Sequence, residues 1–309
     1  MTHTAPLTCT PASQEPTIHS AYEPQTGTWQ YIVGDTATLR AIIIDPVLDY
    51  DAATHALSTH TADALLALVD ANGYTVDRIL ETHVHADHLT AAAYLQSRLA
   101  ELQGGNRPRI CIGKRITNVQ KVFGARYGVP VEEYEGAFDV LLEDGEEFAV
   151  GGLSVTVMPL PGHTPDHIGY MVGANVFCGD SLFHADLGSA RCDFPGGSAA
   201  ALYKSAQKLL RLPEHVKIWT GHDYVSKERA TPVPCLTVRN HRARNKHFAQ
   251  GVTQPEFVAR REERDAMLAE PKLLHAALQV NIRAGRLPRP TALGLCLLHL
   301  PLKLEGAGW

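Results

Sequence analysis

The stretch His83-Val84-His85-Ala86-Asp87-His88 brings four side chains that can bind a metal into six consecutive residues. It follows the apolar run 78–80, which predicts a short buried strand, and it precedes residues 89–102, whose leucines recur with the period of a helix. In an extended backbone the first two histidines point to the same side. The turn into the helix aims the aspartate and the third histidine at a neighbouring point. Imidazole and carboxylate ligands together suit zinc, iron and similar metals.

A purely structural role is the alternative for each member of this stretch taken alone. An aspartate such as Asp87 at the start of a helix is favoured by the helix dipole, and a single histidine is more often structural than a metal ligand. Four such side chains at this spacing, separated by valine and alanine, are instead typical of a metal site. The stretch therefore predicts a metal centre on a strand-to-helix turn.

Length and composition describe an ordinary globular protein. The chain has 309 residues, of which 45% are hydrophobic and 20% charged, and its net charge of −5 argues against general nucleic-acid binding. No apolar run reaches the roughly 18 residues of a spanning helix, and residues 1–24 carry neither lysine nor arginine, so we expect no membrane segment and no targeting peptide. The six cysteines show no paired spacing, which indicates free thiols and a cytoplasmic location.

Three further polar residues each follow closely after a predicted strand. They are His163, Asp180 and His222. Any one of them alone would be an ordinary loop residue, because loops are rich in such side chains. Side chains at strand ends can converge at one edge of a sheet, where a rigid scaffold holds them. Together with the stretch 83–88, they predict a single composite site.

Other segments predict elements around this site. Residues 140–142 and 148–150, separated by a turn at Gly145, predict a hairpin. Ser198 is a suitable N-cap for a helix that runs through Leu210.

We expect three parts along the chain. Residues 1–24, rich in threonine, proline and serine, predict a flexible segment, and residues 25–225 predict the main domain. Residues 226–309 predict a mostly helical extension packed on the main domain, without a separate core. Within it, a capping-box pattern opens a helix at 253–256, and the apolar residues 295–302 predict a closing strand.

The order of the candidate ligands resembles the metallo-β-lactamase superfamily. The resemblance covers roughly residues 25–225 and rests on the stretch 83–88 followed by His163, Asp180 and His222. It implies an α/β fold, the αβ/βα sandwich of that superfamily, with the metal site at one edge. The C-terminal part would be a mostly helical appendage.

The segments around these side chains further resemble the persulfide dioxygenases, of the ethylmalonic-encephalopathy type in its bacterial branch. These are glutathione-dependent enzymes with non-haem iron. The matching segments are Thr-His-Val-His-Ala-Asp-His-Leu-Thr (82–90), Leu-Pro-Gly-His-Thr-Pro (160–165), Gly-Asp-Ser-Leu-Phe (179–183), Gly-His-Asp-Tyr (221–224) and Gln-Val-Asn-Ile-Arg-Ala-Gly (279–285).

This resemblance implies one Fe(II) per chain, held by the catalytic residues His83, His163 and Asp180. Such a facial triad leaves positions for a sulfur ligand and for oxygen. The remaining four side chains would surround the iron or bind a second metal. They are His85, Asp87, His88 and His222.

The implied reaction oxidises glutathione persulfide with O2 to sulfite and glutathione. Glutathione carries two carboxylates, so its pocket needs cationic or hydroxyl donors, and Arg191 and Tyr224 match such elements of the family. We expect these small molecules as partners, together with a second copy of the chain in a homodimer, and we expect neither nucleic acid nor a membrane.

The same ligands also fit a dinuclear zinc thioester hydrolase of the glyoxalase II type. Two zinc ions would share Asp180 as a bridge and activate water against a thioester carbonyl. A non-enzymatic metal scaffold or sulfide sensor is a further alternative, which would bind its ligand without turnover. The seven ligands do not separate these alternatives, whereas the surrounding segments, including residues 279–285, favour the dioxygenase.

Overall fold

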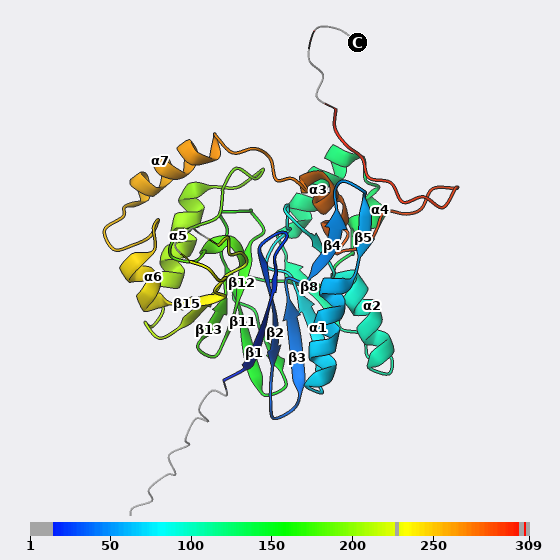
Figure 1. The fold of residues 1–309 in the computed structure, drawn as a ribbon, viewed down its shortest axis with the longest axis horizontal. Helices are drawn as coiled ribbons and strands as arrows, with labels where there is room; N and C mark the ends of the chain where they lie inside the picture. Colours follow the sequence, from blue (N-terminus) through cyan, green and yellow to red (C-terminus); the bar gives the residue numbers. More distant parts are fainter. Residues whose placement is uncertain (1–14, 226–228, 303–305, 307–309) are drawn as a thin grey trace, which may run out of the picture.

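Two sheets packed face to face form the centre of the molecule (Figure 1). The computed structural model describes residues 15–225, 229–302 and 306, and within these ranges each of the two sheets has six strands. The first sheet has the order β1 (Thr17–Glu23), β2 (Thr28–Gly34), β3 (Arg40–Ile44), β6 (Thr75–Leu80), β8 (Arg109–Gly113) and β9 (Val140–Leu142). The second has the order β10 (Glu147–Val150), β11 (Leu153–Pro159), β12 (Ile168–Val172), β13 (Asn175–Phe177), β14 (Lys217–Trp219) and β15 (Cys235–Thr237). A small third sheet joins β5 (Ala56–Ser58), β4 (Val47–Asp51) and β7 (Leu89–Thr90).

Helices cover the outer side of each large sheet. The helices on the side of the first sheet are α1 (His60–Ala71), α2 (Ala92–Leu102), α3 (Ile116–Tyr127), α4 (Val131–Tyr134) and α8 (Leu274–Asn281). The helices on the side of the second sheet are α5 (Ala199–Leu210), α6 (Val238–Arg244) and α7 (Gln254–Asp265). Ser198 caps α5 as predicted, because its side chain accepts a hydrogen bond from the backbone N–H of Ala201.

The apolar run of β3 explains this layering. Ile42 and Ile44 lie in the cluster between the two sheets, whereas Ala41 and Ile43 belong to the cluster beneath the helices. Successive side chains of a strand face opposite sides, so a strand covered on both faces needs an unbroken apolar sequence. The result is the αβ/βα sandwich that we expected from the sequence.

Parallel pairing brings the ends of several strands to one edge. β3, β6, β8 and β9 run parallel in the first sheet, and β13 and β14 run parallel in the second. β11 has the same direction as β13, since both pair antiparallel with β12. The loops that follow β11, β13 and β14 therefore emerge at one edge of the second sheet. The loop that follows β6 joins them there, since the Thr82 carbonyl accepts from the N–H of Ile168 at 2.9 Å.

The predicted hairpin over residues 140–150 is wrong. β9 ends the first sheet beside β8, whereas β10 ends the second sheet beside β11. Gly145 does make the expected turn, with a φ of +77° that suits glycine, but the turn passes the chain from one sheet to the other. The sequence of two short strands and a glycine does not indicate whether the strands pair with each other or join different sheets.

Both ends of the chain also depart from prediction. Residues 1–14 of the expected flexible segment lie outside the described residues, but Thr17–Glu23 form β1 and pair with β2 along their whole length. Residues 295–302 form no strand. The backbone N–H of His299 instead donates to the side chain of Gln279, at 2.9 Å, which satisfies it without a sheet partner.

Residues 229–302 pack partly on one half of the sandwich and partly on the other. The capping box that opens α7 forms as predicted, and α7 packs against α5 on the side of the second sheet. The chain then crosses to α8, which contacts β7 and α3 on the side of the first sheet (Figure 1). This crossing brings the C-terminal part next to the stretch 83–88.

Candidate metal centre

The predicted ligands lie at the sheet edge, on loops that leave four strands. The stretch 83–88 follows β6 and leads through β7 into α2. His163 follows β11, Asp180 lies in the short 3₁₀ turn η1 (Gly179–Ser181) after β13, and His222 follows β14. The histidines among them are buried, as is Asp180, whereas Asp87 is partly exposed.

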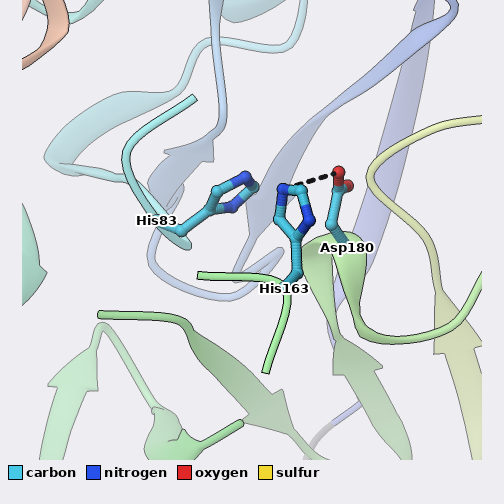
Figure 2. Close-up of side chains that lie close together, drawn as sticks. All are labelled: His83, His163 and Asp180. Atoms are coloured by element: carbon cyan, nitrogen blue, oxygen red, sulfur yellow. Dashed lines mark ion pairs between the residues drawn. The ribbon is translucent and has the colours of Figure 1, made fainter. Parts of the chain in front are cut away.

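Three of these side chains converge from three separate loops. Figure 2 shows His83, His163 and Asp180 facing a common point. One ligand atom from each lies within 4.8 Å of the others, and His163 Nε2 is 3.6 Å from Asp180 Oδ2. Two imidazoles and a carboxylate in this arrangement are the donor set of a facial triad.

The protonation and pairing of these groups fit a bound cation. His83 Nε2 and Asp180 Oδ1 are buried and have no hydrogen-bond partner among the described residues. Leaving such atoms unpaired costs free energy unless something else binds them. Burial, reinforced by neighbouring histidines, holds the pKa of His83 well below its usual value, so the ring stays neutral and able to bind a metal.

Hydrogen bonds on the far side of each ring fix its orientation. His163 donates through Nδ1 to the backbone carbonyl of Arg191, at 2.7 Å, which leaves Nε2 free to face the site. The Thr82 hydroxyl donates to Asp45 at 2.8 Å, so its oxygen must accept from His83 Nδ1, at 2.9 Å. Such outer hydrogen bonds select the tautomer that binds a metal.

A second group of ligands adjoins the triad. His85, Asp87 and His88 also place ligand atoms within 4.8 Å of one another, and both ring nitrogens of His88 lack a hydrogen-bond partner among the described residues. His222 Nε2 lies 3.0 Å from Asp87 and 3.6 Å from Asp180 Oδ1. The seven predicted side chains thus form one cluster, in which Asp180 lies between the two groups.

Two buried carboxylates that we did not predict form hydrogen bonds with the stretch 83–88 and with the residue before it. His85 Nε2 is 3.2 Å from both Asp45 and Glu81. Burial alone would lower the pKa of His85, but the charge and hydrogen bond of Asp45, joined by those of Glu81, hold it well above its usual value. Asp45 also accepts from the backbone N–H of Thr82 at 2.7 Å. Glu81 lies two residues before His83 and could have been suspected from that position, whereas Asp45 is distant in sequence.

Two further residues of the His163 loop also escaped prediction. Asp166 accepts from the backbone N–H of Val84 at 2.9 Å. His167 accepts from the backbone N–H of Asp180, also at 2.9 Å, and stacks on His83 with ring centroids 4.7 Å apart. Both residues thus connect this loop to neighbouring loops. Because they lie close to His163 in the sequence, they could have been considered as residues of the site.

The cluster opens into a pocket of about 920 Å³. Both predicted substrate residues line this pocket. Tyr224 is 48% exposed and stacks on His222, with the ring planes 6° apart. The Arg191 guanidinium is already engaged, because it donates to Asp193 at 2.6 Å and to the carbonyl of Ala269 at 2.9 Å.

Two cations from the C-terminal part line the same pocket and were missed. Arg264 lies in the last turn of α7, and Lys272 precedes α8. Neither side chain makes a hydrogen bond or ion pair within residues 15–225 and 229–302. The sequence shows them as part of a charged helix and a loop, and only the crossing from α7 to α8 brings them to the site.

The chain resembles known proteins over most of its length. Residues 25–222 match the metallo-beta-lactamase superfamily. A beta-lactamase hydrolase-like protein of Xylella fastidiosa is 44% identical over 96% of this chain and 68% of its own length. The mitochondrial persulfide dioxygenase ETHE1 of Homo sapiens is 27% identical over 89% of this chain and 91% of its own.

A solved structure has the same architecture. ETHE1 from Myxococcus xanthus matches with a TM-score of 0.68 and 29% sequence identity, over 87% of this chain and all of that one (100%). Among the described residues of this chain, no helix is long and apolar enough to span a bilayer.

Proposed function

The chain belongs to the metallo-β-lactamase superfamily, and on that basis we propose that it is a glutathione-dependent persulfide dioxygenase. The observation that carries the proposal is the convergence of His83, His163 and Asp180 beside a pocket that the last two line, with buried and unpaired ligand atoms on His83 and Asp180. Two histidines and one carboxylate are typical of non-haem iron oxygenases. The likeness to the two ETHE1 proteins supports the same reaction.

The three side chains of the triad would hold one Fe(II). When bound, this ion would supply open positions for a sulfur ligand and for O2, so that glutathione persulfide, O2 and water yield sulfite and glutathione. The protein's own contribution is to keep the triad preorganised. His163 is oriented by the Arg191 carbonyl, and His83 by Thr82 and Asp45.

The pocket offers donors for the two carboxylates of glutathione. Arg264 and Lys272 have no competing hydrogen bond or ion pair among the described residues, and their charges suit carboxylates. Burial, with the nearby charge of Asp87, raises the pKa of Tyr224, so its hydroxyl stays protonated and can donate. Arg191 lines the same pocket but shares its guanidinium with Asp193.

A paired product assay tests the proposal. Anaerobically purified protein receives glutathione persulfide in air and under nitrogen, and S-lactoylglutathione in a parallel reaction. We expect sulfite and glutathione in air, no sulfite under nitrogen, and little or no D-lactate. Oxygen-independent release of D-lactate without sulfite would show that the protein is a thioesterase.

Arg264→Gln should weaken binding of the anionic substrate. Loss of one charged hydrogen bond at a partly exposed site costs about 1 kcal/mol, which corresponds to a roughly fivefold higher KM for glutathione persulfide at nearly constant kcat. Arg260→Gln is the matched control, since Arg260 lies on the same helix and does not line the pocket. Equal KM values for the two variants would remove Arg264 from the binding site.

The dinuclear zinc thioesterase is the second candidate, and one observation favours it. The two carboxylate oxygens of Asp180 face different histidines, with Oδ2 3.6 Å from His163 and Oδ1 3.6 Å from His222, as a bridging ligand requires. The likeness to the beta-lactamase hydrolase-like protein of Xylella fastidiosa supports it as well. The homodimer and the cytoplasmic location expected from the sequence stay predictions.

A further inference from the structure

A single side chain of the C-terminal part holds the turn that carries the metal ligands. Asn281, the last residue of α8, is 3% exposed. Its amide nitrogen donates to the backbone carbonyls of His85 and His88, both at 2.8 Å. Its amide oxygen accepts from the backbone N–H of Thr90 at 2.9 Å.

These three hydrogen bonds satisfy polar groups that the turn leaves open. Residues 85–88 lie between β6 and β7, outside any helix or strand, so their backbone groups have no partner within a helix or sheet. An unpaired buried carbonyl or N–H destabilises the folded protein, so the turn depends on an external donor and acceptor. One side chain that bonds both ends of the turn also fixes its curvature, and the curvature aims His85 and His88.

A close backbone approach supports the same contact. Gly285, four residues further on, has a φ of +84°, and a Cβ there would lie 2.9 Å from the carbonyl oxygen of Thr90. The end of α8 can therefore approach the turn only without a side chain at this position. Residues 281–285 therefore pack directly against the ligand turn.

We propose that Asn281 is a positioning residue of the metal centre. By clamping the turn between His85 and Thr90 it holds the loop that begins with the triad ligand His83 and carries the second ligand group, and it thereby sets metal affinity. The inference rests on the proposed metal-binding role of the triad and its neighbours, and it is independent of the reaction. Outer residues that orient ligands typically change metal affinity by about 10–100-fold when they are lost.

Gln279 provides a matched control on the same helix. It is 2% exposed, and its side-chain amide also makes three hydrogen bonds to the backbone. It donates to the carbonyls of His275 and His299, at 2.7 and 2.8 Å, and accepts from the N–H of His299 at 2.9 Å. None of these contacts reaches the ligand turn, so Gln279→Ala reports the stability cost alone.

The experiment measures Co(II) binding to metal-free full-length protein. Wild type, Asn281→Ala, Asn281→Asp and Gln279→Ala are compared by chelator competition, by the visible spectrum of bound Co(II), and by the Tm of the metal-free form. Asn281→Asp keeps the size and the acceptor for Thr90 but loses both donors. If Asn281→Ala does not fold, Asn281→Asp therefore still tests the role of the two hydrogen bonds that Asn281 donates.

We expect similar losses of Tm in the two alanine variants. The Kd for Co(II) should rise by about 10–100-fold in both Asn281 variants, with an altered spectrum, and stay near the wild-type value in Gln279→Ala. Asn281 variants that match Gln279→Ala in Kd and spectrum would overturn the inference while leaving the proposed function intact. A wild-type protein that binds no Co(II) would overturn both.

Discussion

His83→Ala, His163→Ala and Asp180→Ala are each expected to leave a folded protein without iron and without persulfide-dependent oxygen uptake. Each change removes one of three converging ligands, and two remaining ligands hold a divalent ion poorly. Oxygen uptake should fall to the level of buffer alone. Metal analysis and an oxygen electrode on the same preparation measure both losses.

The Tm of each metal-free variant shows whether the variant has lost only its metal or also its folded structure. His83 Nε2 and Asp180 Oδ1 are buried without a hydrogen-bond partner among the described residues. The relief of the unsatisfied atom offsets part of the cost of the cavity that alanine leaves and, for His83, of the lost hydrogen bond to Thr82, so each of these metal-free variants should melt close to the Tm of metal-free wild type. A large drop in Tm would mean that the side chain has a structural role.

His222→Ala is the informative contrast to these variants. His222 contacts Asp87 and Asp180 at 3.0 and 3.6 Å and lies outside the triad. In the mononuclear account the variant keeps its iron and turns over more slowly. If His222→Ala lost its metal as completely as His83→Ala, the assignment of a single iron to the triad would be wrong.

Asp45→Ala should cause a large loss of stability in the metal-free protein. Asp45 is fully buried and accepts from the N–H and hydroxyl of Thr82 and from His85. Its removal leaves these donors without their acceptor. One of them is the His85 imidazole, whose protonated form the carboxylate stabilises. Breaking one side of such a buried pair costs about 3–5 kcal/mol, to be measured by urea unfolding in the presence of a chelator.

Two controls accompany the Asp45 variant. Asp45→Asn keeps one acceptor oxygen and should recover part of the loss. Asp77→Ala removes a surface partner of Arg40, an ion pair that is partly exposed on both sides and contributes at most about 1 kcal/mol. An Asp45→Ala protein as stable as Asp77→Ala would show that the buried carboxylate is dispensable.

The core of the site could be predicted because its signals are local, whereas the sandwich was expected from the resemblance to the metallo-β-lactamase superfamily. The spacing of His83 to His88 places several ligands on one turn. His163, Asp180 and His222 could be added because each closely follows a strand. In these cases a few neighbouring residues determine the structure.

The rest depends on contacts between distant parts of the chain. Asp45 looks like an ordinary polar residue in the sequence, and the resemblance of residues 279–285 gives Asn281 no role. Their hydrogen bonds to the ligand turn appear only when separate elements pack together. Arg264 belongs to a charged helix, and its position beside the pocket follows from the packing of α7 against α5, which the sequence does not show. The failed hairpin at Gly145 has the same cause, since the choice of sheet is not local.

The assignment of one iron to the triad is tested most directly by the metal content of anaerobically purified protein, measured together with oxygen uptake on glutathione persulfide. We expect about one iron per chain and oxygen uptake proportional to iron, as one facial triad requires. About two zinc ions per chain, with no oxygen uptake at full metal occupancy, would contradict it and assign the same seven ligands to a dinuclear hydrolase.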